Sequence, residues 1–289
     1  MLRYGYITNG LSDHSLEQAI ELLVRHGYRG IGITLDHHHL DPFQVSDARL
    51  AEIRGLLDQA GLEPVIETGA RYALDPQRKH WPSMVSSSSS DRQRRIEYYL
   101  RAIDIAKAIG ASTVSLWSGI AEAGTDRDVA CQYLLDSLGV VLDAASNCQV
   151  RIGFEPEPGM LIESLDQWRW LRGEISSEVL GLTVDLGHLA VTEPHSPQQA
   201  LSSVIDEVIN VHVDDCKNRV HEHLPLGAGE IDFEPLLQIL LENGYGGMAL
   251  VELSRDAHRA PLMVEQSIGF LLEAEGQGDS GSGRAGESS

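Results

Sequence analysis

The chain alternates eight times between a short apolar run and a stretch with helical periodicity. The apolar runs are rich in β-branched residues, and they lie near residues 2–8, 30–35, 63–68, 112–118, 151–156, 181–187, 208–214 and 247–253. Between them, apolar residues recur three or four positions apart, as at Ile96, Tyr99, Leu100 and Ile103, which is the period of an α-helix. Eight strands that alternate with helices can close into a parallel barrel. The pattern therefore predicts an α/β fold, a single-domain (β/α)8 TIM barrel.

An open, doubly wound sheet is the structural alternative, but it usually has fewer strands. Its dinucleotide-binding form also needs a glycine fingerprint after the first strand, and YITNGLSDHS lacks one. The helix boundaries agree with a strand–helix repeat. Serine followed by glutamine three positions later matches the capping box at Ser15, Ser90, Ser164 and Ser196. Glycines that are expected to end helices stand at Gly27, Gly61, Gly110 and Gly244.

At 289 residues the chain has an ordinary length for one barrel. We assign residues 1–275 to the barrel, and residues 276–289, GQGDSGSGRAGESS, to a disordered tail because of their glycine and serine content. Two of the loops that follow strands are long, residues 69–90 and 216–232. Long loops of this kind build substrate pockets on barrels. Trp81 in the first of them is either a lid over such a pocket or a packing anchor.

The formal net charge is −21, and this excess of carboxylates makes nucleic acid and anionic membranes poor partners. Three cysteines are present without a CxxC motif, which fits a reduced protein. The first residues, MLRYGYITNG, carry no basic segment followed by an apolar one, and no run approaches membrane-spanning length. We expect a cytoplasmic protein that binds neither nucleic acid nor membrane.

Four polar residues stand near the ends of the last four strands: Glu155, Asp185, His212 and Glu252. The carboxyl ends of parallel barrel strands gather on one face, where three carboxylates would repel one another without a cation. Oxygen ligands with one imidazole suit Mn²⁺, Mg²⁺ or Co²⁺, while Zn²⁺ is possible but has no thiolate to favour it. These four residues, called the quartet below, predict a site for one divalent metal ion.

Further polar or aromatic residues are expected on the same face and are candidates for substrate binding: Glu67, Trp117, Glu157, His188, Lys217, Arg219, His221 and His223. Lys217 and Arg219 are the cations nearest to the site and could hold an anionic or hydroxyl-rich substrate, or they are solvated loop charges. His221 and His223 alternate along an extended stretch, so both could point into the site. The triplet His37–His39 follows the second strand and is either a further part of the site or an exposed polar loop.

The segments TVDLGH, NVHVDDCKNRVHEHLPLGAGEIDF and YGGMALVEL resemble the xylose isomerase-like barrel family, the sugar phosphate isomerases and epimerases. The resemblance covers the whole barrel and is strongest from 151 to 254. It implies that the quartet binds one divalent ion, that His188 contacts substrate, and that residues 227–232 form a glycine-rich turn. Two departures stand out. Asp214 occupies the position of a lysine found in many relatives, and Glu157 is a second candidate for the place of Glu155.

The resemblance implies an isomerase or epimerase that acts on a sugar, a cyclitol or a related polyhydroxy carbonyl compound through an ene-diolate. In it, Glu155 and Glu252 would move protons on opposite faces of the substrate, and His188 would orient an oxygen. A small sugar-like substrate is the expected partner, and relatives of this kind often form homo-oligomers. Three alternatives stay open: a multi-metal phosphoester hydrolase similar to endonuclease IV, a cyclitol dehydratase, and a non-catalytic binding protein.

Overall fold

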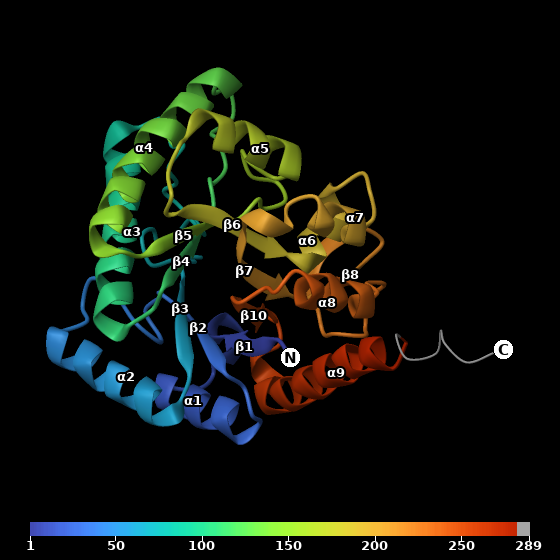
Figure 1. Ribbon diagram of the computed structural model, residues 1–289. Coiled ribbons are helices and arrows are strands. Elements are labelled where there is room, and N and C mark those ends of the chain that lie inside the picture. Colours follow the sequence, from blue (N-terminus) through green and yellow to red (C-terminus); the bar gives the residue numbers. More distant parts are fainter. Residues whose placement is uncertain (282–289) are drawn as a thin grey trace.

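The computed structural model describes residues 1–281 and shows a closed barrel of parallel strands surrounded by helices (Figure 1). The strands follow one another around the barrel in the order β1-β10-β7-β6-β5-β4-β3-β2. Their bounds are β1 (Arg3–Ile7), β2 (Gly30–Thr34), β3 (Glu63–Glu67), β4 (Thr113–Leu116), β5 (Arg151–Phe154), β6 (Leu180–Asp185), β7 (Val208–Val213) and β10 (Met248–Val251). Each coincides with one of the eight apolar runs, so the predicted (β/α)8 TIM barrel is confirmed.

The helices lie outside the strands (Figure 1). Their bounds are α1 (Leu16–Arg25), α2 (Asp47–Ala60), α3 (Ser89–Ile109), α4 (Arg127–Cys148), α5 (Leu165–Glu174), α6 (Leu186–Thr192), α7 (Pro197–Ser202), α8 (Phe233–Glu242) and α9 (Ala260–Gly281). Residues 1–281 also contain three short 3-10 helices, η1 (Thr8–Leu11), η2 (Ile205–Glu207) and η3 (Ala257–Arg259). The helix α9 passes residue 275, so the predicted start of the tail falls inside this helix, and residues 282–289 of the tail lie outside the described part.

Two of the four predicted capping boxes are complete, at Ser15 and Ser196, where each serine and the glutamine three residues later bond each other's backbone. At Ser164 the serine accepts the expected backbone bond, but the glutamine side chain turns to Glu163. The prediction at Ser90 was wrong. The helix α3 begins two residues earlier than a cap at Ser90 requires, and Ser88 caps it by accepting from the Asp91 backbone N–H.

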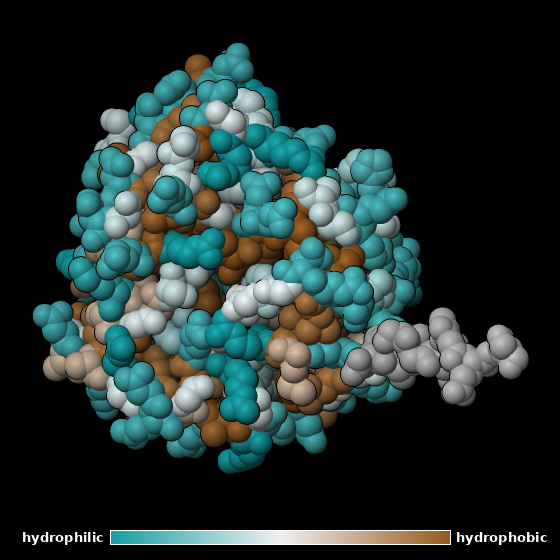
Figure 2. Space-filling model, in the orientation of Figure 1, coloured by the Kyte–Doolittle hydropathy of each residue, from teal (hydrophilic) through white to brown (hydrophobic). Residues whose placement is uncertain are grey.

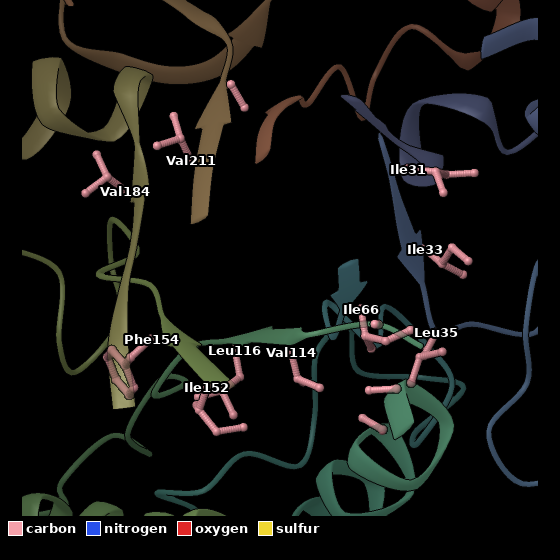
Figure 3. Close-up of a cluster of buried hydrophobic side chains, with 14 of the residues drawn as sticks. Ile31, Ile33, Leu35, Ile66, Val114, Leu116, Ile152, Phe154, Val184 and Val211 are labelled. Atoms are coloured by element: carbon pink, nitrogen blue, oxygen red, sulfur yellow. The ribbon is translucent and has the colours of Figure 1, made fainter. Parts of the chain in front are cut away.

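Large apolar side chains fill the layer between the strands and the helices. Figure 3 shows several of them, with Ile31, Ile33 and Ile152 pointing outward from their strands. The interior of the barrel leaves less space for side chains than the layer between strands and helices. A Cβ on Gly153 would lie only 2.3 Å from Thr183 Oγ1, so a glycine is needed there.

At the carboxyl ends of the strands, the side chains that point into the barrel are polar. Because side chains alternate along a strand, Gly153 is followed on the same face by Glu155, and Thr183 by Asp185. Asp185 is paired directly with His212 in the register of β6 and β7. The barrel thus places the quartet at one end of its axis.

A small antiparallel hairpin, β8 (Asp215–Lys217) and β9 (Val220–Leu224), stands where the sequence predicted only a loop. Its base is fixed by the Asp215 carboxylate, which accepts hydrogen bonds from the backbone N–H groups of Cys216, Gly227, Gly229 and Ile231 at 2.8–3.1 Å. The glycine-rich turn is therefore tied to the hairpin by one buried side chain.

Hydrophilic residues cover much of the face seen in Figure 2. Contrary to the expectation from sequence, one helix among the described residues, α4, is long and apolar enough to cross a membrane by length and composition. Core helices of soluble proteins meet the same criteria, and α4 packs Leu134, Leu138 and Val141 into the barrel core.

Candidate metal centre and active site

The structure brings the quartet together at the carboxyl ends of β5, β6, β7 and β10. Each of its four residues offers one ligand atom, and these atoms all lie within 4.8 Å of one another. Glu155, Asp185 and His212 are buried, and Glu252 is partly buried. The group thus has the residue types, the proximity and the burial of a metal site.

His212 lies at the centre of the carboxylates. Its Nδ1 is 3.1 Å from Glu155 Oε1 and 3.2 Å from Glu252 Oε2. Its Nε2 is 3.1 Å from Glu67 Oε1. Burial lowers the pKa of His212, but the carboxylates of Glu67 and Glu155 outweigh burial and raise this pKa well above its usual value. Positive charge is strongly favoured at this point of the barrel.

The carboxylate of Asp185 shows that the quartet fits a cation. Its Oδ1 accepts the backbone N–H of His188 at 2.8 Å, while its Oδ2 is buried without a hydrogen-bond partner. A buried, unpaired carboxylate oxygen is costly unless a cation or a donor meets it. A divalent ion held by Asp185 Oδ2, the two glutamates and His212 Nδ1 would satisfy it.

Glu67 contacts the other ring nitrogen of His212 and is buried at the end of β3. Asn210, two residues before His212, donates to Glu67 Oε1 at 3.5 Å and lies 3.1 Å from His212 Nε2. A carboxylate on the second nitrogen of a metal-binding histidine fixes the orientation of the ring. Glu67 was expected to bind substrate, and its contacts instead place it behind His212.

His188 and Glu157 lie beside the quartet, as the sequence predicts. His188 Nδ1 is 3.5 Å from Glu155 Oε1 and 3.7 Å from Glu157 Oε2, and it has no hydrogen-bond partner. Burial raises the pKa of Glu157 to about 8, although the nearby His188 opposes the shift. Glu155 belongs to the quartet, whereas Glu157 groups with Glu155 and His188. The geometry therefore favours Glu155 as the ligand.

The structure also brings His221 and His223 to this face, on β9. His221 Nε2 lies 3.0 Å from His188 Nε2.

Trp117, which follows β4, is buried, and its ring packs edge-on against His80 at 5.4 Å and under the Arg95 guanidinium at 4.5 Å. Trp81, in the long loop 69–90, has the Arg78 guanidinium over its ring, 4.6 Å from the ring centroid.

Lys217 and Arg219 are not brought into the site. Asn218 and Arg219 form the tight turn of the hairpin, both with positive φ. Lys217 is exposed, and Arg219 donates to the backbone oxygens of Val191 and Glu193 at 2.8 and 3.0 Å. The expectation that these two cations hold the substrate therefore finds no support in their positions.

The histidine triplet is likewise apart from the quartet. His37 pairs with Asp41 at 2.8 Å, and His38 and His39 both contact the backbone oxygen of His14. None of the three is in a metal-compatible group within residues 1–281. They belong to the loop that follows β2 and hold it to the η1 region.

Sequence reasoning missed three polar residues near the quartet. Asn9, just beyond β1, donates to Glu252 Oε1 at 2.7 Å, and Arg71 donates to the Asn9 backbone oxygen at 3.1 Å. Desolvation lowers the pKa of Lys79, Arg71 adds to this shift and Glu157 opposes it, so Lys79 lies within electrostatic range of both residues. Arg71 and Lys79 lie in the long loop 69–90, whose length was the available signal, but no motif marks them.

Active sites of (β/α)8 barrels lie at the carboxyl ends of the strands, where these residues gather. The chain belongs to the xylose isomerase-like TIM barrel family. The sequence model of that family matches residues 20–274. Among curated proteins it is similar to L-ribulose-5-phosphate 3-epimerase UlaE of Salmonella typhi, with 27% identity over 222 residues that cover 75% of this chain and 77% of the relative.

Solved structures support the same fold. A D-tagatose 3-epimerase-like protein superposes with a TM-score of 0.80 at 21% identity and covers 97% of this chain and 100% of its own. An IolI protein described with a bound zinc atom superposes with a TM-score of 0.77 at 16% identity, over 96% of this chain and 99% of its own. The homologues of this chain thus include sugar epimerases, and one structural relative carries a metal.

Proposed function

We propose that the protein is a divalent-metal-dependent epimerase that inverts a carbon next to the carbonyl group of a ketose or ketose phosphate. The observation that carries this proposal is the quartet, in which two glutamates from β5 and β10 meet at the same nitrogen of His212. The sugar epimerases among the homologues support the reaction class.

The quartet would hold the cation through carboxylate oxygens and His212 Nδ1. When bound, a divalent ion there polarises the carbonyl oxygen and stabilises the negative charge of an ene-diolate. Glu67 would keep the ring of His212 in place by accepting from Nε2–H, the hydrogen bond that the 3.1 Å contact provides.

Glu252 is suited to begin as the base. The pKa of Glu252 lies well below its usual value. Burial alone would raise this pKa, but the hydrogen bond from His212 and the positive charges of His223 and His212 lower it by more. The Asn9 amide holds its other oxygen at 2.7 Å. An ionised, oriented carboxylate can take a proton from the carbon on one face, and Glu155 can return one to the opposite face. The two glutamates exchange these roles for the reverse reaction.

His188 has a supporting role. Its Nδ1 is buried, has no hydrogen-bond partner and faces Glu155 and Glu157. A substrate oxygen between these groups would receive a hydrogen bond from Nδ1–H. Arg71, which donates to the backbone oxygen of Asn9, and Lys79 are cations near the site that could attract a substrate with a phosphate group.

A screen of ketoses and ketose phosphates with the Mn²⁺-, Mg²⁺- and Co²⁺-loaded protein tests the proposal. We expect a product of unchanged mass and inverted configuration, and chelator treatment should abolish its formation. A product lighter by one water would indicate a dehydratase, and release of inorganic phosphate a hydrolase. Failure to retain any divalent metal would support a non-catalytic binding protein.

Glu67→Gln is expected to lower the affinity for the catalytic cation by about 10–100-fold, the usual effect of removing a carboxylate behind a metal-binding histidine. The amide keeps the shape of the side chain but loses the charge that favours Nε2–H on His212. Isothermal titration of the chelator-treated protein with Mn²⁺ measures the effect. Glu63→Gln, on the same strand but paired with Arg3 at the surface, is the matched control. Equal affinities for the two variants would refute the assignment of Glu67.

A further inference from the structure

One buried charge lies outside the quartet and has no opposite charge to pair with. Arg95, on α3, is completely buried, and within residues 1–281 it forms no ion pair. Its Nη2 donates to the backbone oxygen of Thr68 at 3.5 Å, while Nε and Nη1 have no acceptor on the protein. A guanidinium stays charged in a protein, and burial of an unpaired charge is costly. Packing alone would therefore favour an apolar side chain at this position.

Aromatic rings surround Arg95 where a carboxylate would be expected. Its guanidinium lies over the rings of Trp117, Tyr99 and Tyr98, at 4.5, 4.8 and 5.2 Å from their centroids. The face of an aromatic ring attracts a cation, most strongly when the ring is tryptophan and water is excluded. Trp117 is buried just beyond β4, and the Tyr99 hydroxyl donates to its backbone oxygen at 3.4 Å. Arg95 thus holds the side chain that follows the carboxyl end of β4.

The contacts of Arg95 continue into the loop 69–90. The His80 ring packs edge-on against Trp117, with 5.4 Å between the ring centroids. His80 Nδ1 meets the backbone oxygen of Gly69, which can only accept, so Nδ1 carries a proton. Burial lowers the pKa of His80 to about 4, although this hydrogen bond opposes the shift, and the ring is neutral at neutral pH. Because Gly69 follows Thr68, the contacts of Arg95, Trp117 and His80 form a closed ring.

The same loop has a backbone conformation that its own residues do not favour. Ala70, Arg71 and His80 have φ values of 56°, 34° and 63°. Residues other than glycine adopt such values mainly where the surrounding structure imposes them. The His80 backbone N–H also donates to the Arg71 backbone oxygen at 2.6 Å, which fixes these two residues relative to each other. Contacts from outside the loop are therefore needed to hold it in this conformation.

The loop also reaches the quartet. Arg71 donates to the backbone oxygens of Asn9 and Ser254 at 3.1 and 3.5 Å. Asn9 donates in turn to the carboxylate of Glu252 at 2.7 Å, and Ser254 lies two residues beyond Glu252 in the chain. The position of the loop therefore decides whether the Arg71 guanidinium lies beside the candidate active site.

We propose that Arg95 is a positioning residue, which acts through Trp117 and His80 to hold the loop 69–90 against the candidate active site. A loop held in this way keeps water from a bound substrate and completes the wall of the site. The charge of Arg95 is needed because an apolar side chain would fill the same space without attracting the Trp117 ring. Arg95 itself does not touch the quartet, so its effect on the site passes through the other two side chains.

Hydrogen exchange of the full-length protein tests this role without a substrate. Arg95→Met keeps an apolar side chain of similar length and removes the charge. The backbone N–H groups of Arg71, Ala73 and His80 are hydrogen-bonded within the loop, and they should exchange about 10–30-fold faster in this variant, the factor that one desolvated cation–π contact gives. Replacement of a buried, unpaired charge by an apolar side chain often leaves stability unchanged or raises it, so Tm should not fall. Arg101→Met, exposed on the same helix, is the matched control and should alter neither quantity.

Two outcomes with Arg95→Met would overturn the proposal. One is unchanged exchange of the three loop N–H groups in the folded variant. The other is loss of the fold, or a lower Tm with faster exchange throughout the barrel, because the guanidinium would then serve stability alone.

Trp117→Phe provides an independent check of the path, since a smaller ring weakens the contacts with both Arg95 and His80. The same N–H groups should exchange faster in this variant. The Arg95→Met/Trp117→Phe double variant should exceed the larger single effect by little, because residues that act through one another are not additive. Fully additive effects would contradict the path through Trp117.

A kinetic measurement extends the test and, unlike the exchange experiments, rests on the proposed epimerase function. With the ketose substrate found in the screen, Arg95→Met should raise KM by a larger factor than it lowers kcat, because the quartet keeps its contacts. A loss confined to kcat would place Arg95 in the chemical step and contradict a role in positioning the loop. If no ketose is turned over, the epimerase proposal fails, and the exchange results still decide the role of Arg95.

Discussion

Glu252→Gln is expected to lower kcat by at least about 10²–10⁴-fold, the contribution of a positioned general base. The substitution keeps the size of the side chain and its hydrogen bond with Asn9, but it removes the carboxylate that meets His212 Nδ1 at 3.2 Å. Steady-state kinetics with the substrate found in the screen measures the loss. Glu265→Gln, on the exposed side of α9, is the matched control and should keep wild-type rates.

The same variant separates loss of the base from loss of the metal. Glu155 still faces the substrate in Glu252→Gln, so this variant should exchange the proton of one epimer with solvent without inverting the carbon. Bound metal, measured by elemental analysis at saturating concentration, should be retained. Wild-type turnover by a folded, metal-loaded Glu252→Gln protein would contradict its assignment as a proton carrier.

Glu155→Gln is expected to have a comparably large effect, while Glu157→Gln should cost much less. Glu155 Oε1 contacts His212 Nδ1 at 3.1 Å and belongs to the quartet, whereas Glu157 lies beyond it and faces His188 and His221. Because burial raises the pKa of Glu157 to about 8, its carboxyl group is mostly neutral at neutral pH, as a glutamine amide is. Parallel measurement of kcat for both variants at neutral pH distinguishes the two residues. A greater loss in Glu157→Gln would reverse the assignment.

The barrel and the quartet were predictable from sequence because both depend on short-range patterns. Eight apolar runs predicted eight strands, and alternation along each strand predicted which residue at its end faces inward. Glu155, Asp185, His212 and Glu252 needed only this regular geometry to converge. Their place on successive barrel strands follows from the order of the chain.

Residues in loops were harder to predict because their positions depend on turn geometry and on distant contacts. The charges of Lys217 and Arg219 suggested a role in the site, but Lys217 is exposed and the Arg219 guanidinium donates to the backbone oxygens of Val191 and Glu193. Arg71 and Lys79 come close to the site only through the path of the loop that follows β3. Asn9 is single and unpatterned, and nothing in its neighbours predicts its bond to Glu252.

Glu67 shows a different limit of sequence reasoning. Its position at the end of β3 was correctly expected to face the same side as the quartet. Whether it meets the substrate or another side chain depends on the width of the barrel and on Asn210, which lies beneath His212. Such contacts between side chains of separate strands require the folded structure.

Deuterium incorporation tests the proposed proton transfer most directly. The metal-loaded wild-type protein is incubated with its ketose substrate in D₂O, and both epimers are examined by mass spectrometry and NMR. We expect one deuterium at the inverted carbon next to the carbonyl, because Glu155 and Glu252 exchange their protons with solvent. Inversion with only protium at that carbon, even at equilibrium, would contradict epimerisation by these two glutamates.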